Sequence, residues 1–271
     1  MDAPDDPDAA ERGPAAPAPM PVRLPTSVAL LWGRVPDTPR RGPKPTLTIR
    51  DIARAAVAIA DDRGWESVSM KAIAQSVGLT AMSLYRYVDS KDDVIDLLVD
   101  EAYGTADPHL ATSGTWRERI TDWAHAAAST LRARPWLTEI PMSRPPVGPN
   151  VLSWTESGVR AFDPTALTGP QKMNALLLVD GFVRQHIRQS AQMGLLPGDG
   201  GARAGARKGA QPPTPGYEAV VASLIDADRF PALTAAVQTM ADGNDDFDGE
   251  QFEFGLGVIL DGLAGMIDTL D

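Results

Sequence analysis

The stretch Val68–Lys91, VSMKAIAQSVGLTAMSLYRYVDSK, contains two short helical patterns separated by Gly78. In the first pattern, Ser69 is placed to cap a helix, and apolar residues recur at the i, i+3, i+4, i+7 spacing of an amphipathic helix. These apolar residues are Met70, Ile73, Ala74 and Val77. Gly78 has no Cβ and can therefore adopt the positive φ that a tight turn between two helices requires. The stretch predicts a helix-turn-helix.

The second pattern runs from Ala81 to Val88 and combines a narrow apolar stripe with polar groups that would gain little from burial. Thr80 can cap this helix, and Leu84 and Val88 form the stripe. The residues left outside are Met82, Ser83, Tyr85, Arg86 and Tyr87. Hydroxyl and guanidinium groups on an exposed helix can reach phosphates and base edges of DNA. A recognition helix is therefore predicted, although a small helical hairpin without DNA-binding function can show the same spacing.

The order of these residues resembles the tetracycline-repressor (TetR) family of transcription regulators. The matching groups are Ile73-Ala74, Val77-Gly78-Leu79, Leu84-Tyr85-Arg86-Tyr87-Val88 and Ser90-Lys91, within a match from Leu47 through Leu98. The resemblance implies an all-α fold, in which an N-terminal three-helix DNA-binding domain precedes a larger C-terminal helical domain for ligand binding and dimerisation. It also implies a ligand-responsive regulator, most simply a repressor, that binds a palindromic double-stranded DNA operator as a homodimer.

The resemblance further implies roles for single residues. The positions that match DNA-contacting positions of the family are Lys71, Thr80, Ala81, Met82, Ser83, Tyr85, Arg86, Tyr87 and Lys91. The tyrosines and Lys91 would mainly hold phosphates, whereas Arg86 and the first residues of the helix would discriminate bases. Alanine and methionine can contact thymine methyl groups, where other members carry glutamine or arginine. This departure leaves the operator sequence and the regulated genes unpredicted.

The net charge of -11 is unfavourable for a DNA-binding protein as a whole, because duplex binding relies on neutralising phosphates. The distribution of charge resolves this conflict. Residues 40–91 hold nine Lys and Arg against five Asp and Glu, which is +4, so the remainder of the chain carries -15. A basic N-terminal part on an acidic body favours contact with DNA through the basic end.

A chain of 271 residues is long enough for two folded units. We expect a disordered proline-rich arm at residues 1–45, the helix-turn-helix domain at 46–104, and the C-terminal domain at 105–271 with a mobile loop at 194–216. Residues 1–45 hold 11 of the 24 prolines, a composition that does not form a packed core. The apolar segment Ser27–Trp32 could dock on the body or on a partner, but a loosely packed arm is the preferred interpretation. Arg40–Lys44 could enter a minor groove or remain a solvated linker.

Beyond the recognition region, amphipathic patterns and proline or glycine boundaries predict a series of helices. Their expected ranges are 46 or 48 to 63, 91–103, 116–134, 151–162, 171–192, 217–225, 230–240 and 248–270. Asn150 is placed to cap the helix that begins at Val151. The family resemblance makes helix 91–103 the link between the DNA-binding domain and the body, so its tilt is the expected lever for ligand control.

The last helix, Asp248–Leu270, contains Gly255, Gly257, Gly262 and Gly265, each of which disfavours a helix by about 1 kcal/mol relative to alanine. Close helix packing would compensate for this cost. The resemblance implies a homodimer through this helix and Gln171–Gln192. The expected interface residues are Phe252, Leu256, Ile259, Leu263 and Ile267, with Leu176, Leu177, Val179, Val183 and Ile187. Alternatively, these glycines pack within one subunit.

A small-molecule pocket between the helices of the body is also expected, because such pockets are apolar with a few polar anchors. The candidate lining residues are Trp123, Trp136, Met142, Trp154, Met173, Asp180, Phe182 and Arg184. Ordinary core packing could explain each of them, and Asp180 and Arg184, four residues apart, could simply pair with each other. The identity of the effector does not follow from the sequence.

No enzymatic chemistry is predicted, and we expect no catalytic residue, metal or cofactor. The chain has no cysteine, and its three histidines, His109, His125 and His186, lie in separate segments without ligand-like spacing. No apolar run approaches the roughly 20 residues of a membrane span, so we expect a cytoplasmic protein without membrane contact. The alternatives are a helical small-molecule-binding protein, or an enzyme, with a non-functional DNA-binding domain.

Overall fold

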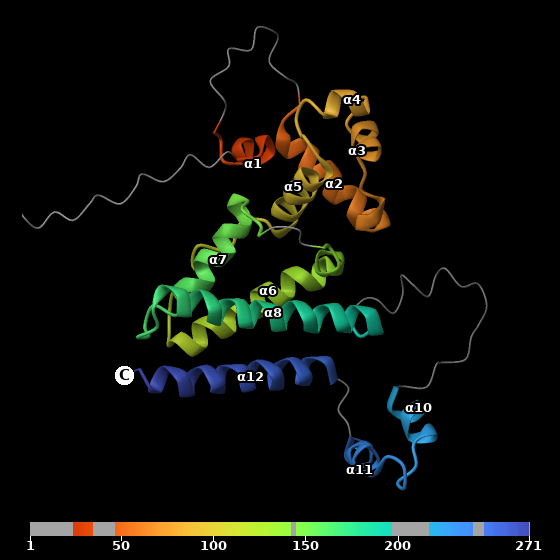
Figure 1. The fold of residues 1–271 in the computed structure, drawn as a ribbon, viewed down its shortest axis with the longest axis vertical. Coiled ribbons are helices and arrows are strands. Elements are labelled where there is room, and N and C mark those ends of the chain that lie inside the picture. The colour runs from red at the N-terminus through yellow and green to blue at the C-terminus, as the bar shows by residue number, and fades with distance from the viewer. Residues whose placement is uncertain (1–23, 35–46, 142–144, 197–216, 241–246, 271) are drawn as a thin grey trace, which may run out of the picture.

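The computed structural model describes residues 24–34, 47–141, 145–196, 217–240 and 247–270, and every regular element in these ranges is helical (Figure 1). The elements are α1 (Thr26–Leu31), α2 (Ile49–Arg63), η2 (Trp65–Ser67), α3 (Met70–Ser76), α4 (Ala81–Leu84), α5 (Lys91–Tyr103), α6 (Trp116–Ala133), η3 (Pro135–Thr138), α7 (Pro149–Ala161), α8 (Gly169–Met193), α10 (Tyr217–Leu224), α11 (Pro231–Met240) and α12 (Phe247–Asp268). The predicted all-α fold is confirmed. None of the described helices is long and apolar enough to cross a bilayer.

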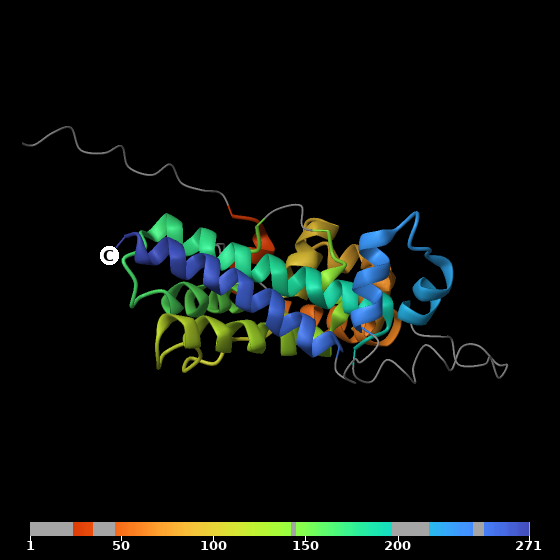
Figure 2. The ribbon, with the colours of Figure 1, turned by 90° about the horizontal axis from the view of Figure 1, so that it is seen from below.

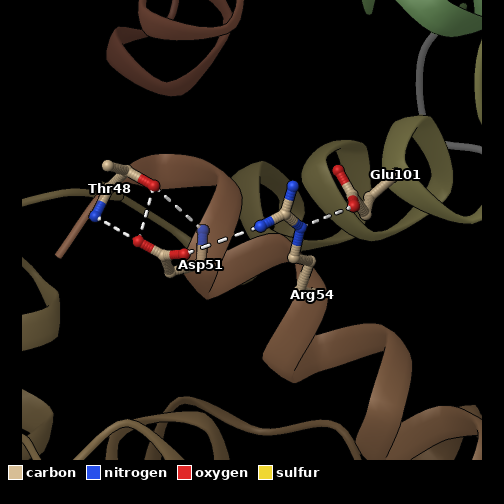
Figure 3. Close-up of polar contacts among 4 residues, drawn as sticks. All are labelled: Thr48, Asp51, Arg54 and Glu101. Atoms are coloured by element: carbon tan, nitrogen blue, oxygen red, sulfur yellow. Dashed lines mark hydrogen bonds and ion pairs between the residues drawn. The ribbon is translucent and has the colours of Figure 1, made fainter.

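Helices α2 to α5 form a small N-terminal unit, here called the reading head. Helix α2 begins with a capping box, in which the Thr48 amide donates to Asp51 Oδ2 at 2.8 Å and the Asp51 amide donates to Thr48 Oγ1 at 3.2 Å. The Thr48 hydroxyl, which donates to Asp51 Oδ2 at 2.6 Å, and the Thr48 amide together lower the pKa of the Asp51 carboxyl. One turn further along, Arg54 Nε lies 3.2 Å from Glu101 Oε1 and joins α2 to α5 (Figure 3).

Helices α6, α7, α8 and α12 form the larger unit, here called the body. Figures 1 and 2 show α8 and α12 side by side along most of their length. The apolar stripes of these two helices are buried against each other and against α6, so they form one hydrophobic core with the rest of the body. Helices α10 and α11 contact each other and lie beyond α12, away from this core (Figure 1).

The expectation of a disordered arm over residues 1–45 is wrong for Leu24–Arg34. Residues 26–31 form α1, which packs on α5 and α2 (Figure 1). Val28 is 1% exposed, and the Trp32 indole N–H donates to the Val147 carbonyl at 2.8 Å. Burial of an apolar side chain and one long-range hydrogen bond therefore hold this short segment on the molecule. Residues 1–23 and 35–46, including Arg40–Lys44, lie outside the described residues.

Two further expectations need correction. Asn150 does not cap α7: the helix begins at Pro149, its N-cap residue is Gly148, and the Asn150 amide instead donates to Asp100 of α5. In the segment predicted as a mobile loop, Gly194 ends α8 with φ +72° and Leu196 is buried. The rest of that loop, residues 197–216, lies outside the described residues.

The cap of α3 can be tested by mutation. Ser69 Oγ accepts from the Ala72 amide at 3.2 Å, so Ser69→Ala leaves that amide without its partner. We expect a loss of about 1 kcal/mol in the free energy of unfolding, measured by urea denaturation. Ser76→Ala is the matched control at the other end of α3, because the Ser76 hydroxyl only donates back to the Ile73 carbonyl. An equal loss in both variants would contradict the assignment of Ser69 as the cap.

Candidate nucleic-acid interface

The turn between α3 and α4 is built around Gly78. Its φ is +71°, in the left-handed region that a side chain disfavours, and its amide donates to the Gln75 carbonyl at 3.3 Å. The next amide, of Leu79, donates to the Ala74 carbonyl at 2.7 Å, while the Leu79 side chain packs half-buried against the core. This turn fixes the direction in which α4 leaves α3.

Two fully buried residues anchor the second helix. Leu84 and Val88 are 0% exposed, and Thr80 caps the helix by accepting from the Ser83 amide at 3.2 Å. The helix itself is shorter than predicted, because the α-helical part ends at Leu84 and residues 85–87 form turns. The Tyr87 amide donates to the carbonyl of Leu84, three residues back, at 2.9 Å. Such i+3 bonds tighten the last turn of a helix and stop its regular continuation.

The side chains predicted to contact DNA divide into two groups. Met82 is 78% and Tyr85 is 49% exposed. Lys71, Thr80, Arg86 and Lys91 are also exposed. Ala81, Ser83 and Tyr87 are half-buried, and Tyr87 packs against the core. The reading head therefore presents a surface, here called the reading surface, made by Lys71 of α3, Met82, Tyr85 and Arg86 of the α4 region, and Lys91 at the start of α5.

The hydroxyl groups at the start of α4 are engaged locally. Thr80 Oγ1 and Ser83 Oγ lie 3.0 Å apart, in addition to the capping bond to the Ser83 amide. Thr80 therefore acts first as a helix cap, which sequence reasoning assigned to it together with DNA contact. On the reading surface, the guanidinium of Arg86 and the ammonium groups of Lys71 and Lys91 supply positive charge, and Met82 supplies an apolar tip.

In the body, four of the predicted pocket residues gather around a fifth residue that was not predicted, Tyr103 at the end of α5. The ring of Tyr103 lies 6.3 Å from that of Trp154, which lies 6.4 Å from that of Trp123. The Arg184 guanidinium is 5.4 Å from the Tyr103 ring, and Arg184 Nε pairs with Asp180 at 2.7 Å. The alternative that Arg184 and Asp180 pair with each other is thus confirmed. These five residues are called the aromatic cluster.

Both indole N–H groups of the aromatic cluster already have partners: Trp123 donates to the Trp154 carbonyl at 2.9 Å, and Trp154 donates to the Gly104 carbonyl at 3.0 Å. Burial raises the pKa of Tyr103 to about 12. Its hydroxyl oxygen is buried beside the Arg184 guanidinium, which opposes this rise in the pKa. Its place at the last position of α5, before Gly104, was the only sequence signal that could have marked it.

The other predicted pocket residues lie elsewhere, so the eight do not form one group. Trp136 donates to Asp61 Oδ1 at 2.9 Å, where η3 meets α2. Phe182 packs 5.6 Å from the Phe252 ring, on the side of α8 that faces α12. Met173 is 50% exposed, and Met142 lies outside the described residues. Sequence spacing placed Met173 and Phe182 on the right helix but could not assign them to the correct faces.

The residues predicted to form a dimer interface are mostly buried within the chain. Phe252, Leu256, Leu263, Ile267, Leu176, Val179, Val183 and Ile187 are all at most 6% exposed. They join α12 to α8 inside one subunit, so the predicted stripe is wrong as an intersubunit surface. The exceptions are Leu177, which is 69% exposed, and Ile259, which is half-buried. The wrong stripe was chosen because both helices carry a second apolar face, which is less regular in the sequence than the first.

The second face lies on the outer sides of α8 and α12 and is here called the outer face. It consists of Met173, Leu177 and Leu178 of α8, with Phe254, Val258 and Met266 of α12, and each of these side chains is between 38% and 76% exposed. Of the four glycines that were expected to allow close packing, only Gly255 meets a close neighbour, because a Cβ there would overlap the Phe182 ring. Gly257, Gly262 and Gly265 face open space within the described residues.

Both parts of the chain are similar to known protein families. Residues 52–98 match the model of the tetR family of bacterial regulatory proteins, and residues 108–267 match the tetracyclin repressor-like C-terminal domain. The HTH-type transcriptional repressor DrrR1 of Streptomyces coeruleorubidus is 34% identical over 246 residues, which cover 89% of this chain and 86% of that protein.

Solved structures agree with this assignment. The TetR family protein ActR of Streptomyces coelicolor in complex with actinorhodin has 26% sequence identity and a TM-score of 0.63, covering 81% of this chain and 98% of ActR. Apo ActR has 21% identity and a TM-score of 0.66, covering 84% and 100%, which shows the same fold. Regulators of this family are DNA-binding transcription factors, so the expectation that the protein is not an enzyme is confirmed. The chain belongs to the TetR family of bacterial transcription regulators.

Proposed function

We propose that the protein is a transcriptional repressor that binds a palindromic operator as a homodimer and leaves it when a small aromatic molecule binds the body. The observation that carries this proposal is the orientation of the α4 region. Leu84 and Val88 are 0% exposed, whereas Met82 and Tyr85 on the opposite side are 78% and 49% exposed. An exposed apolar tip and an exposed arginine on a short helix are of little use to folding, but they can contact bases in a major groove.

On DNA, the reading surface would combine base contacts with phosphate contacts. Arg86 can donate two hydrogen bonds to a guanine edge, and Met82 can contact a thymine methyl group. Lys71, Tyr85 and Lys91 surround them and would bind phosphates, which position the helix without reading the sequence. These groups come from three consecutive helical elements of the reading head, which are α3, the α4 region and the start of α5.

A homodimer through the outer face is supported by its composition. Protein surfaces seldom expose a contiguous apolar patch of this kind without a partner. Gly257, Gly262 and Gly265 leave open space along α12, which would allow a helix of a second copy to approach closely. Two copies joined there would present two reading heads, as a palindromic operator requires.

The aromatic cluster is the proposed effector site. It offers aromatic rings, a guanidinium and a buried hydroxyl, which suit a planar aromatic ligand with polar substituents. Tyr103 belongs to α5, the helix that starts at the reading surface. A ligand that draws Tyr103 toward itself would therefore act on the reading head directly. The complex of ActR with actinorhodin, an example of a relative with such a ligand, supports this class of effector.

Arg86→Ala should lower operator affinity by about 1 to 3 kcal/mol and relax the preference at one base pair, because it removes a direct base contact. Lys91→Ala should weaken binding to operator and to random DNA alike, because a phosphate contact carries no sequence information. Fluorescence anisotropy with both DNAs measures this difference. If both variants bind the operator as the wild type does, the reading surface has been assigned to the wrong residues.

Leu177→Arg should convert the dimer to a monomer, because it places a charge in the centre of the outer face. Size-exclusion chromatography with light scattering measures the molar mass. Leu224→Arg on α10 is the matched control, since Leu224 is 75% and Leu177 is 69% exposed. A Leu177→Arg protein that stays dimeric would rule out the outer face as the interface.

Tyr103→Phe should leave operator binding of the free protein unchanged, because the hydroxyl lies beside Arg184 of the body and not on the reading surface. Release by a planar aromatic effector should become weaker, by about tenfold in the concentration for half-release if that hydroxyl bonds the ligand. Actinorhodin is the first probe, with operator occupancy followed by anisotropy. If the wild type and Tyr103→Phe leave the operator at the same effector concentration, Tyr103 does not belong to the effector site.

A further inference from the structure

Helix α7 begins without a cap of its own. Its N-cap residue is Gly148, which has no side chain, and its first residue is Pro149, which has no N–H. The next two amides, of Asn150 and Val151, are the ones that an N-cap side chain normally binds. Both donate to Oδ1 of Asp100, at 2.9 and 3.0 Å. The missing cap is therefore supplied by a residue of α5, 50 positions earlier in the sequence.

Asp100 is only 2% exposed, although it carries a carboxylate. Burial raises the pKa of this carboxyl, and the hydrogen bonds from Val151 and Asn150 oppose that rise. A buried carboxylate is tolerated when it is fully hydrogen-bonded, and the positive end of a helix dipole favours an anion at this place. An apolar side chain would pack there at lower desolvation cost, but it could not hold the two helices in register.

The chain around this contact is shaped to fit it. A Cβ at Gly148 would overlap the Asp100 carboxylate, so the absence of a side chain there permits the close approach of α7 to α5. The carbonyl of Val147, one residue earlier, accepts the indole N–H of Trp32 at 2.8 Å. Helix α1 and helix α5 thus hold the same turn, and both pack within the reading head.

Further hydrogen bonds extend the contact along α7. Asn150 Nδ2 donates to the Asp100 carbonyl at 3.1 Å, and the Thr105 hydroxyl donates to Asn150 Oδ1 at 2.7 Å. One turn later, the Trp154 indole donates to the Gly104 carbonyl at 3.0 Å. The first turns of α7 are therefore bound to the C-terminal end of α5, where the two helices lie next to each other in Figure 1. Any change of angle between reading head and body must strain or break these bonds.

We propose that Asp100 is a positioning residue for operator recognition: by capping α7 from α5, it fixes the angle of each reading head on the body. This inference rests on the proposed function. A palindrome is bound only when the two recognition helices are about 34 to 36 Å, one duplex turn, or a multiple of this apart. A loosened angle spoils that spacing, whereas a single half-site is bound by one head regardless of the angle.

The test compares two DNA duplexes. The first is a palindrome selected from a random pool by the wild-type protein, and the second retains one half-site with the other scrambled. Asp100→Ala should lower affinity for the palindrome by about tenfold or more, while affinity for the half-site changes by less than about twofold. Fluorescence anisotropy gives both dissociation constants. Circular dichroism and light scattering establish that the variant is a folded dimer.

Two other variants keep the test decisive if Asp100→Ala does not fold. Gly148→Ala disturbs the same contact from the side of α7 and should give the same selective loss of affinity for the palindrome. Gly169→Ala, at the start of α8, is the control and should cause no loss, because no atom lies within 4 Å of its added Cβ. Asp100→Asn retains an acceptor oxygen and should restore most of the palindrome affinity. Parallel losses on palindrome and half-site, or no loss in a folded Asp100→Ala or Gly148→Ala dimer, would overturn the proposal. A wild-type protein that binds neither duplex would instead overturn the proposed function.

Discussion

Burial of Leu84 and Val88 is the constraint on which the reading surface depends. The α-helical part of α4 spans only Ala81–Leu84, which is too short to be stable on its own propensity. Its position comes from these two side chains, both 0% exposed, from the Thr80 cap, and from the Gly78 turn. Because the apolar side is fixed inward, Met82, Tyr85 and Arg86 are directed outward. The same packing that completes the core of the reading head therefore exposes the groups that we propose to contact DNA.

The link between the reading head and the body includes directional hydrogen bonds in addition to apolar packing. Asp100 caps α7, Trp154 bonds the end of α5, and the ion pair between Arg134 and Asp61, at 3.1 Å, joins η3 to α2. Hydrogen bonds are directional, so such a contact defines an angle better than apolar packing does. Such hydrogen bonds can hold one angle between the two units firmly. A different set of hydrogen bonds at another angle can replace them at a moderate cost in free energy. The proposed effector site adjoins it through Tyr103 and Trp154.

Much of the fold was predictable from the sequence, because local signals decide it. Ser69, Gly78, Thr80 and Ser90 mark the ends of the helices in the reading head, and the structure assigns them these roles. The longer helices were recognised from their 3.6-residue periodicity and from boundaries at proline and glycine. Within the reading head, the exposed and buried sides of α4 also followed from the pattern, since only Leu84 and Val88 are spaced to share a buried face.

Contacts between distant segments were not predictable in this way. Helices α8 and α12 each carry two apolar faces, and no spacing rule tells which of them is covered within the subunit. Asn150 is of a residue type that commonly caps helices, but Asp100 of α5 binds the first free amides of α7 instead. Similarly, the docking of α1 depends on Trp32 meeting a carbonyl 115 residues away. Each of these outcomes is a tertiary contact that overrides a local preference.

Selection of bound DNA from a random pool by the full-length protein tests the central claim most directly, because the recovered sequences report both contact and symmetry. We expect an inverted repeat whose half-site centres are about one duplex turn, roughly 10 base pairs, or a multiple of it apart. Loss of this enrichment in Arg86→Ala would locate the contact on the α4 region. Recovery of no enriched sequence, or of a single motif without two-fold symmetry, would contradict a pair of reading heads held by two copies of the body.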